Sequence, residues 1–422
     1  MKILIVGSGG REHAIAWKLK ENKNIEKIFI APGNAGIDLL PNTESLSLNN
    51  NIKEYADFAE KNKIDLTIVG SEELLVQGIV DEFKNKGLKI FGPDKKAAIL
   101  EGSKAYSKDF MKKYGIKTAK YEIFDNYEKA QKYLDSYRND NFPVVIKTSG
   151  LAAGKGVIIV KNLKEAKDAV TDIMINKKFG TSGEKIVIEE YLEGIEASIL
   201  SFTDCKTIVP LISAKDHKKI GESETGLNTG GMGAISPNPY VTESIFKEFT
   251  EKIMKPTLKG IQNEDMDFAG VIFFGLMITK KGVYLLEYNM RMGDPETQAV
   301  LPLLETNLYQ IIEKSFEKKL NEVNIKWKSL HSCCVVATAE GYPEQYRKGD
   351  EISGILKEKN NDELLFICGV KKENSKFVTS GGRVLNITCL GNTLEEARKK
   401  AYNAMKNINF KGMYYRKDIG KI

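Results

Sequence analysis

Short runs of apolar residues alternate with amphipathic stretches along the first hundred positions of the chain. The apolar runs are rich in Ile, Leu and Val and predict strands that are covered on both faces, at 2–7, 27–33, 64–70 and 88–93. The stretches between them have apolar residues three and four positions apart and predict helices, over 11–22, 52–63 and 74–87. This alternation predicts a parallel sheet with helices on both faces.

The pattern is more varied after residue 100. Helical periodicity recurs at 104–115, 126–138, 164–175, 242–262 and 302–319. Apolar or β-branched runs predict strands at 144–146, 157–160, 185–194, 197–202, 207–213, 270–278, 283–289, 332–340, 365–370 and 383–391. A final helix is predicted after 392, with a capping box at Thr393 and Glu396.

These elements define a domain plan for the 422 residues, a length too great for one ordinary domain. The fold class is α/β. We expect a Rossmann-like N-terminal domain over 1–100, a mixed region over 101–325 and a small α+β C-terminal domain over 326–422.

Composition and charge narrow the class of protein. The chain is 42% hydrophobic and 28% charged, as soluble globular proteins are, and its net charge of +6 is small for its length. Lysines are spread along the chain without a basic block, so we expect no nucleic-acid partner. The longest apolar stretch, 270–278, is too short to span a bilayer, and the N-terminus leads straight into a strand and not into a signal peptide. We therefore expect no membrane partner and a cytoplasmic location.

The five cysteines have no C-x-x-C spacing, and each lies among apolar residues. This predicts buried free thiols in a reducing compartment, without a disulfide or a cysteine metal site.

A glycine-rich segment between the strands at 144–146 and 157–160 contains Gly154 and Lys155. The P-loop pattern would need a glycine where Ser149 stands, and Ser or Thr where Gly156 stands. A P-loop also runs from a strand into a helix, whereas this segment joins two strands. We interpret it as a glycine-rich hairpin whose backbone amides, with Lys147 and Lys155, approach phosphates.

The turn after the first strand, "VGSGGREHA", resembles a dinucleotide fingerprint but has Glu12 where the third glycine belongs. The second strand ends in Ala-Pro-Gly and lacks the acidic residue that would bind a ribose hydroxyl, so NAD binding is not expected. A turn at Gly9 and Gly10 before a helix suits a phosphate, with Arg11 adding charge. A plain tight turn explains the same residues equally well.

The strand at 283–289 carries polar residues at alternating positions. Glu287, Asn289 and Arg291 fall on one face, because side chains two positions apart on a strand point the same way. A carboxylate and an amide oxygen suit Mg²⁺, and an arginine suits an anionic substrate. Asp294 and Glu296 follow where the strand is broken. Upstream, acidic residues from Glu189 to Glu196 fit an adenosine pocket by their position after the lysine hairpin.

The segment 213–234 is long, polar and glycine-rich, which is typical of a functional loop. Asp216 lies at one end, and Thr229, Gly230 and Gly231 lie at the other. With three histidines in the chain, no Ser-His-Asp or Cys-His arrangement is evident, so covalent nucleophilic catalysis is not indicated.

The order of these motifs resembles the ATP-grasp ligases. The strings "GGREHA", "APGNAG", "LEGSKA", "GLAAGKGV", "NTGGMGA", "GDPETQ", "GGRVL" and "RKDIG" are similar to the phosphoribosylamine–glycine ligase (glycinamide ribonucleotide synthetase) family of that superfamily, over the whole chain. The resemblance implies an ATP-grasp domain pair in 101–325, with a lid subdomain at about 120–190 and a metal and substrate subdomain at about 191–325. Ser71, Thr148, Ser149, Met290 and Met292 depart from the family's usual residues, but none of these departures removes a proposed charged contact.

The resemblance also implies a reaction and a set of roles. Glycine, 5-phosphoribosylamine and ATP would give glycinamide ribonucleotide, ADP and phosphate through glycyl phosphate, with Mg²⁺ or Mn²⁺ as the metal. The residues implied to contact ATP are Lys104, Lys147, Gly150, Lys155, Gly156, Glu189, Glu190, Tyr191, Leu192 and Glu196. Glu287 and Asn289 would bind the metal, and Arg291, Asp216 and Asp294 would be catalytic. The residues implied to bind the other substrates are Gly9, Gly10, Thr229, Gly230, Gly231, Pro295 and Glu296. The enzyme is expected to be a monomer or a weak homo-oligomer.

Two other functions compete with this one. Another ATP-grasp ligase, such as a dipeptide or biotin-carboxylating enzyme, would share the lid and the metal strand, but would not be expected to carry "NTGGMGA" or "GDPETQ". A regulatory nucleotide-binding protein with a decayed site is disfavoured by the intact Lys155, Glu287, Asn289 and Arg291.

Overall fold

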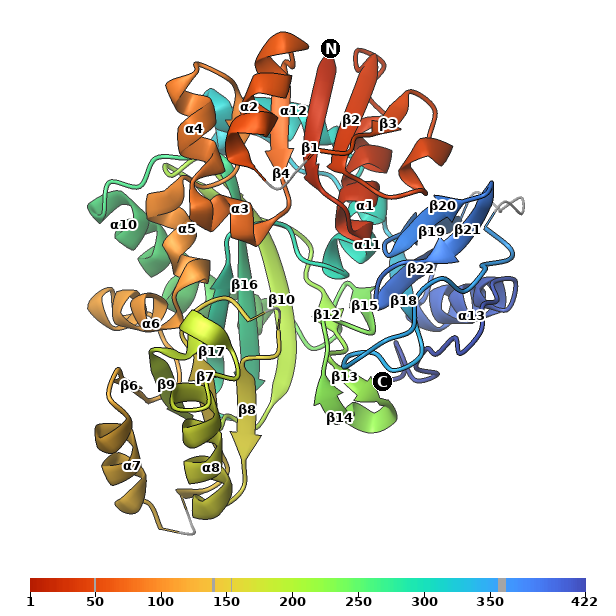
Figure 1. Cartoon of the computed structure of the whole chain (residues 1–422). Coiled ribbons are helices and arrows are strands. Elements are labelled where there is room, and N and C mark those ends of the chain that lie inside the picture. Colours follow the sequence, from red (N-terminus) through yellow and green to blue (C-terminus); the bar gives the residue numbers. More distant parts are fainter. Residues whose placement is uncertain (49–50, 139–140, 153, 356–361) are drawn as a thin grey trace.

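The computed structural model describes residues 1–48, 51–138, 141–152, 154–355 and 362–422 (Figure 1). The N-terminal part is a parallel sheet with strand order β3-β2-β1-β4-β5, which confirms the sheet predicted from the alternating pattern. Its strands are β1 (Lys2–Gly7), β2 (Lys27–Pro32), β3 (Thr43–Ser45), β4 (Leu66–Val69) and β5 (Ile90–Phe91). Its helices are α1 (Gly10–Leu19), α2 (Ile52–Lys61), α3 (Glu72–Gln77) and α4 (Ile79–Asn85).

One predicted helix is broken in two. The stretch 74–87 was expected to be continuous, but Gly78 has φ +97° and separates α3 from α4. Its N–H donates to the carbonyls of Leu74 and Leu75, so Gly78 ends α3 in the left-handed conformation that glycine adopts without a steric penalty.

A small subdomain projects from the body at the lower left of Figure 1. Its antiparallel sheet has the order β6-β9-β7-β8, with α7 and α8 packed on it around a hydrophobic core of its own. The predicted hairpin is confirmed as β7 paired with β8, although the strand β6 was not predicted. The elements are β6 (Tyr121–Phe124), α7 (Tyr127–Asp135), β7 (Val144–Thr148), β8 (Val157–Val160), α8 (Leu163–Met174) and β9 (Ile186–Glu190).

The central sheet has the order β11-β10-β16-β17 and is antiparallel. Leu200 and Phe202 of β10 share one hydrophobic cluster with Ile3 and Ile5 of β1, so the N-terminal sheet and the central sheet are packed together. The strands are β10 (Ile195–Thr203), β11 (Ile208–Pro210), β16 (Gly270–Thr279) and β17 (Gly282–Asn289). The helices around it are α5 (Lys95–Gly102), α6 (Lys104–Lys113), α9 (Glu243–Phe249), α10 (Lys255–Asn263), α11 (Glu296–Val300) and α12 (Leu308–Phe316).

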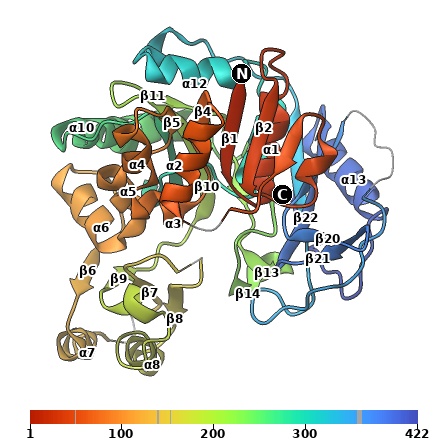
Figure 2. The same ribbon diagram turned by 45° about the horizontal axis from the view of Figure 1, so that its top comes forward.

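The last sheet, with the order β12-β15-β18-β22-β19, combines strands that are far apart in the sequence. β12 (Lys215–Asp216) and β15 (Gly233–Ser236) come from the long polar segment, and β15 pairs with β18 (His331–Thr338). This sheet therefore reaches across the predicted domain boundary at 326, and the boundary itself stays a prediction. Figure 2 shows the C-terminal elements beside the N-terminal sheet, well separated from α7 and α8. The remaining elements are β13 (Lys219–Gly221), β14 (Thr225–Asn228), β19 (Glu363–Ile367), β20 (Val370–Glu373), β21 (Lys376–Thr379), β22 (Arg383–Gly391) and α13 (Leu394–Met405).

Several smaller predictions are resolved by the structure. Thr393 caps α13 by accepting the Glu396 N–H, whereas the Glu396 carboxylate accepts from Asn392 and not from Thr393. All five cysteines are free thiols, four of them buried and Cys368 partly exposed. Within the described ranges, no helix has the length and apolar character needed to cross a membrane.

Candidate active site

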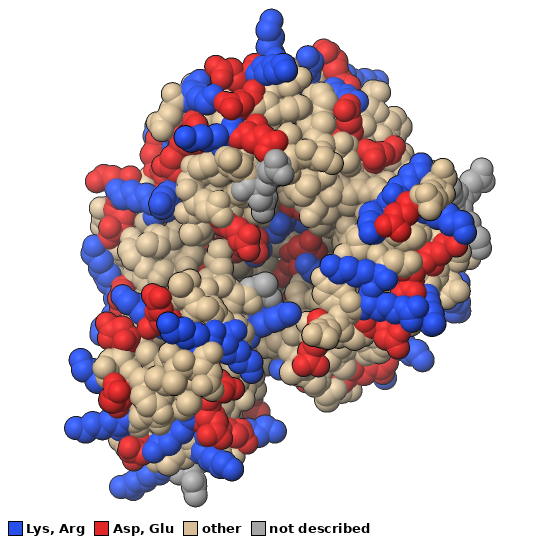
Figure 3. Space-filling view, viewed as in Figure 1, with Lys and Arg blue, Asp and Glu red and all other residues tan. Residues whose placement is uncertain are grey.

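The predicted site residues converge on a hollow between the lid subdomain, the N-terminal sheet and the C-terminal sheet. Figure 3 shows this hollow near the centre of the molecule, with acidic and basic side chains inside it. A separate surface depression between β8 and α8 contains none of the predicted site residues.

The end of β17 supplies the predicted metal-binding pair. A bulge in the pairing of β16 with β17 places Glu287 opposite Gly275 and Leu285 opposite Leu276. Burial alone would raise the pKa of Glu287, but the charges of Lys218, Lys147 and Lys104 outweigh it and lower the pKa below its usual value. Glu287 is therefore a carboxylate at neutral pH.

Arg291 lies just beyond β17 and contacts two acids that the sequence did not single out. Its Nη2 is 2.9 Å from Glu101 Oε1 and 3.4 Å from Asn289 Oδ1, and its Nε is 3.6 Å from Glu72 Oε2. Glu101 also accepts the Met290 N–H at 2.7 Å, so one buried carboxylate orients both the strand end and the arginine. The string "LEGSKA" contained Glu101 but gave no sign of this contact.

Two lysines and one glutamate form a second buried cluster of charges. Lys147 of β7 and Lys108 of α6 are each 3.1 Å from Glu189 Oε2 on β9. The other oxygen, Glu189 Oε1, is buried without a hydrogen-bond partner. Burial lowers the pKa of Lys108 to about 8, despite the nearby Glu189 charge. Lys108 was not predicted, because a lysine at a helical position is usually solvated.

The predicted lid joins β7 to β8 and is described except for residue 153. Lys104, at the start of α6, donates through its Nζ to the Gly150 carbonyl at 3.4 Å. Gly156 is buried, and a Cβ there would lie 2.2 Å from Thr148 Oγ1, so only glycine fits. Lys155 is exposed at the tip of the loop. A Cβ on the neighbouring Gly154 would lie 3.5 Å from the Thr229 carbonyl, so the lid approaches the segment predicted to bind substrate.

The segment after β9 lines the entrance. Glu190 uses its Oε1 to accept the Lys120 N–H at 2.9 Å, and Tyr191 is 42% exposed, so its ring is accessible to a ligand. Glu196, at the start of β10, is 3.0 Å from Lys218 Nζ. Lys218, two positions after Asp216, is another residue to which no role was assigned from the sequence.

Two buried carboxyl groups, those of Asp216 and Glu296, lie close enough for their charges to interact. Asp216 is 8% exposed and its Oδ1 has no hydrogen-bond partner, whereas Glu296 accepts from Ser198 Oγ at 3.1 Å. Burial, and then the charge of Glu296, raise the pKa of Asp216 well above its usual value. The pKa of Glu296 is raised by burial as well.

The glycine turn at 229–231 packs directly against these acids. A Cβ on Gly231, whose φ is +112°, would lie 2.4 Å from Pro295 Cδ and 2.7 Å from Asp216 Oδ1. Arg383 of β22 donates to the carbonyls of Gly230 and Asp294 and is 3.3 Å from Asp294 Oδ1. The quoted string "GGRVL" contained this arginine, but its proximity depends on the pairing of distant strands.

The turn at Gly9 and Gly10 is occupied by groups of the protein itself. Gly9 donates its N–H to Glu12 Oε2 at 2.6 Å. Arg11 donates through its Nε to Glu12 Oε1 and through its Nη1 to the Met292 carbonyl. A Cβ on Gly9 would lie 2.8 Å from Asp294 Oδ2. The turn therefore adjoins the site, and Glu12 already neutralises the helix terminus expected to bind phosphate. A role for Gly9 and Gly10 in binding substrate stays a prediction.

The donor set of β17 fits a hard cation. Mg²⁺ is usually bound by one or two carboxylates together with substrate phosphates, and Glu287 is anionic with Asn289 two positions away on the same strand. Among the described residues, no cluster of three His, Cys, Asp or Glu side chains offers a site made by protein groups alone. The residues present therefore suit a metal that is held jointly with a phosphate-bearing substrate.

Comparisons with known proteins agree with this geometry. Family models for phosphoribosylglycinamide synthetase match the chain in three parts: the N domain over 1–101, the ATP-grasp (A) domain over 102–297 and the C domain over 332–422. A phosphoribosylamine–glycine ligase of Fusobacterium nucleatum is 57% identical, covering 100% of this chain and 99% of the relative. One from Clostridium acetobutylicum is 56% identical, with 100% of both chains covered.

Solved structures give the same result. A crystal structure of phosphoribosylamine–glycine ligase from Thermotoga maritima matches with a TM-score of 0.85 and 32% identity, covering 99% of this chain and 100% of that one. A biotin carboxylase from Campylobacter jejuni matches with a TM-score of 0.75 at 15% identity, which shows a shared fold alone. From its sequence, its fold and the arrangement of its site, the chain belongs to the phosphoribosylglycinamide synthetase family.

Proposed function

We propose that this chain ligates glycine to 5-phosphoribosylamine with ATP, giving glycinamide ribonucleotide, ADP and phosphate. The observation that carries the proposal is the convergence of three groups on one hollow. Glu287 and Asn289 end β17, Lys147 and Glu189 face them from the lid subdomain, and Asp216 lies beside the turn at 229–231. No protein nucleophile is needed for this reaction.

The chemistry has two displacements. An oxygen of the glycine carboxylate attacks the γ-phosphorus of ATP, the bond to the β-phosphate oxygen breaks and ADP leaves. The sugar amine then attacks the carbonyl carbon of glycyl phosphate, the bond to the phosphate oxygen breaks, and the amine loses a proton. Both steps depend on positioning and on neutralisation of negative charge, which a buried site with lysines and arginines provides.

The ATP half is assigned from the lid subdomain and α6. Lys104 and Lys147 would bind the phosphates, and the lid at 150–156, apart from residue 153, would cover them with Gly150, Lys155 and Gly156. The unpartnered Glu189 Oε1 is an acceptor that suits the exocyclic amine of adenine. Glu190, Tyr191 and Leu192 would complete the adenine pocket, and Glu196 would take the ribose hydroxyls.

Glu287 and Asn289 would hold Mg²⁺, or Mn²⁺, together with the phosphates. When bound, the metal would offset the negative charge of the phosphates during transfer. Arg291, held by Glu101 and Glu72, would bind the glycine carboxylate or the transferred phosphoryl group.

The acceptor half is assigned to the buried acids and the glycine turn. Asp216 Oδ1 lacks a partner, and an ammonium or amine of either substrate would satisfy it. Asp294, Pro295 and Glu296 would line the same side. Gly9, Gly10, Thr229, Gly230 and Gly231 would contact the phosphoribosyl group. The same proposal places the enzyme in the cytoplasm as a monomer or weak homo-oligomer, and light scattering of the purified protein tests its mass.

The function is tested by measuring ADP release from Mg-ATP with glycine, with and without freshly made phosphoribosylamine. We expect ADP when both co-substrates are present, matched by an equal amount of glycinamide ribonucleotide. ADP formed with bicarbonate or with other amino acids, and not with this pair, would keep the fold and overturn the substrates.

A further inference from the structure

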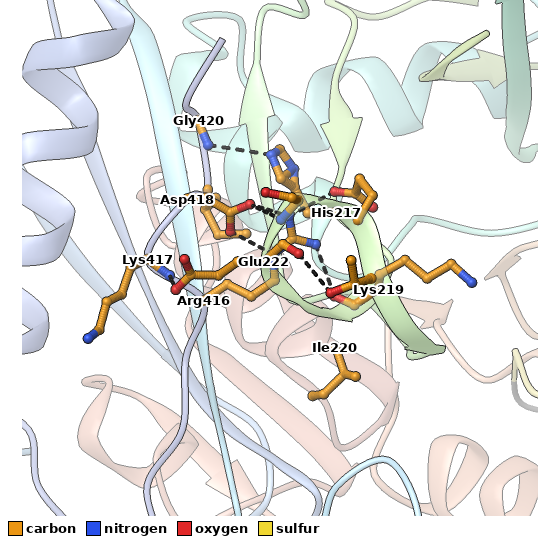
Figure 4. Close-up of polar contacts among 12 residues, drawn as sticks. His217, Lys219, Ile220, Glu222, Arg416, Lys417, Asp418 and Gly420 are labelled. Carbon is orange, nitrogen blue, oxygen red and sulfur yellow. Dashed lines mark hydrogen bonds and ion pairs between the residues drawn. The ribbon is translucent and has the colours of Figure 1, made fainter.

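A buried arginine lies outside the hollow, where the segment 414–420 crosses the β13–β14 hairpin (Figure 4). The Arg416 side chain is 1% exposed and forms a two-point contact with Asp418, Nε to Oδ1 and Nη2 to Oδ2, both at 2.8 Å. Its Nη2 is also 2.8 Å from Glu224 Oε1, and its Nη1 donates to the Lys219 carbonyl at 3.0 Å. A buried guanidinium is costly unless it is paired in this way, so these contacts determine where the hairpin lies.

The same segment holds the tip of the hairpin through three further contacts. Tyr414 donates its hydroxyl to the Ile220 carbonyl at 2.9 Å, Ser223 N–H donates to Asp418 at 2.8 Å, and Lys417 N–H donates to Glu222 at 3.2 Å. Ser223 and Glu224, at the tip, have φ values of +54° and +55°. Non-glycine residues adopt this left-handed conformation only when their surroundings hold them in it.

Beside the hairpin, His217 accepts the Gly420 N–H at 3.5 Å through its Nε2. Burial, followed by the charges of Arg416 and Lys215, lowers the pKa of this imidazole to about 3. The ring is therefore neutral at physiological pH, as an acceptor must be.

The opposite end of the hairpin is part of the active site. The Lys218 carbonyl accepts both the N–H and the hydroxyl of Thr229 at 2.8 Å, and the His217 carbonyl accepts the Met232 N–H at 2.8 Å. The Lys218 side chain reaches Glu196, and its charge acts on Glu287. The Lys219 carbonyl that Arg416 binds is thus one peptide unit from the residue that joins the hairpin to the glycine turn.

We propose that Arg416 is a positioning residue for the acceptor half of the active site, an inference that rests on the ligase function proposed above. It holds the hairpin so that Lys218 and the turn at 229–231 face glycine and the phosphoribosylamine. The ATP half depends on this contact less, because β7, β9 and β17 belong to other sheets and the hairpin reaches Glu196 and Glu287 only through the side chain and charge of Lys218. Arg416 therefore acts through the hairpin and touches neither substrate.

Steady-state kinetics of Arg416→Gln test this role. We expect the KM for glycine and for phosphoribosylamine to rise by about tenfold to a hundredfold, the scale of a small misplacement of binding groups, and the KM for ATP to change by less than about twofold. Arg416→Lys should give an intermediate shift, because an ammonium keeps the charge but cannot make the two-point contact with Asp418. Lys417→Gln is the matched control: it alters the next residue, whose side chain is exposed, and should leave all three KM values unchanged.

Equal changes in all three KM values, or a lower kcat with unchanged KM values, would overturn the proposal, since a general loss of structure gives either pattern. If Arg416→Gln does not fold, Tyr414→Phe removes one hairpin contact from an exposed side chain. It should raise the acceptor KM values by about threefold and leave that for ATP unchanged. We call the contacts between the segment 414–420 and the β13–β14 hairpin the clasp. Unchanged KM values for glycine and phosphoribosylamine in Tyr414→Phe would then count against a role of the clasp in positioning.

Hydrogen exchange separates this proposal from the choice of substrates. In Arg416→Gln, amides at 219–232 should exchange faster, and those at 186–192 should not. We expect this result even if the wild-type protein fails to ligate glycine to phosphoribosylamine. In that case the proposed function would be wrong, but the role of Arg416 in holding the hairpin would be supported. Unchanged exchange at 219–232 would remove the clasp whatever the substrates are.

Discussion

At the scale of single residues, Glu287 is the side chain on which the proposed metal binding depends most. Replacing it by Gln keeps its size but removes the charge that Lys218, Lys147 and Lys104 stabilise. We expect ligation to slow by about a hundredfold or more, as when one charged contact to a transition state is lost. Rates measured over a range of Mg²⁺ concentrations check this, because the variant should also need more metal.

The control for Glu287→Gln is Glu243→Gln, an exposed acid at the start of α9 and outside the predicted site. Wild-type rates and Mg²⁺ dependence are expected for it. A Glu287→Gln enzyme with the wild-type rate would remove Glu287 from the metal site.

Asp216 makes stability depend on pH in a defined direction. Its pKa is raised in the folded protein, so the fold binds this proton more tightly than the unfolded chain does. The contribution of Asp216 to the free energy of unfolding is greatest in acid. It begins to fall as the pH passes the ordinary pKa of 3.8, and it stops falling once the pH exceeds the pKa of the folded state. Glu296 and Glu196 add to the repulsion, and Lys218 and Arg383 oppose it.

Asp216→Asn should therefore unfold at higher denaturant than the wild type at pH 8, by about 1–3 kcal/mol, the usual scale for a buried group without a partner. At pH 4 the two proteins should be nearly equal, and ligation by the variant should be slow. Urea titrations at both pH values measure this. A variant that is less stable than the wild type at pH 8 would show that Asp216 has a stabilising partner.

The grouping of polar side chains at the end of β17 could be predicted from the sequence, because two rules act within one strand. Alternate side chains share a face, and buried polar groups need a partner. The sequence did not predict four further charged residues of the site, because each reaches it through the packing of elements far apart in the chain. These residues are Glu101, Lys108, Lys218 and Arg383. Arg383, for example, contacts a carbonyl 153 positions away.

At the scale of elements, the proposed lid is the β7–β8 hairpin, whose connecting segment carries Lys155. Lys155→Ala should raise the KM for ATP by about tenfold, because an ammonium that neutralises phosphate contributes on the order of one such factor. Lys161→Ala, an exposed lysine just after β8, is the matched control and should leave the KM unchanged. Equal KM values for the wild type and Lys155→Ala would show that the lid closes without this charge.

Most of the longer elements were predicted, although α5 was not, whereas several short strands such as β3, β12 and β15 were missed. The apolar runs of β1, β10 and β16 stand out because their strands are covered on both faces. β12 spans Lys215–Asp216 and β15 spans Gly233–Ser236, and such short, polar or glycine-rich strands form only because β18 offers an edge to pair with.

At the scale of the whole molecule, the N-terminal sheet resembles a dinucleotide-binding fold without its fingerprint. Mg-ATP at a hundred times its Kd should stabilise the protein by about 2.7 kcal/mol, visible as a higher melting temperature. NAD at the same concentration should produce no shift, because Glu12 stands where the third glycine of the dinucleotide fingerprint belongs and the second strand lacks the acidic residue that would bind a ribose hydroxyl. A clear rise in melting temperature with NAD would contradict the expectation that the chain does not bind this dinucleotide.

The domain plan could be outlined from the sequence, but not the sheet that crosses it. β15 lies about a hundred positions before β18, with which it pairs, so no local pattern indicates that the two share a sheet. The proposed acceptor half depends on this pairing, whereas the subdomain of β6–β9, α7 and α8 has a core made of residues close in sequence.

The clasp has a consequence for how the protein is made. Arg416 binds a carbonyl 197 positions earlier in the chain, so the ribosome releases the β13–β14 hairpin long before its partner exists. Until that partner emerges, the left-handed tip at Ser223 and Glu224 lacks the contacts from Arg416 and Asp418. A chain that ends before Arg416 would therefore lack the contacts that hold the hairpin beside the glycine turn.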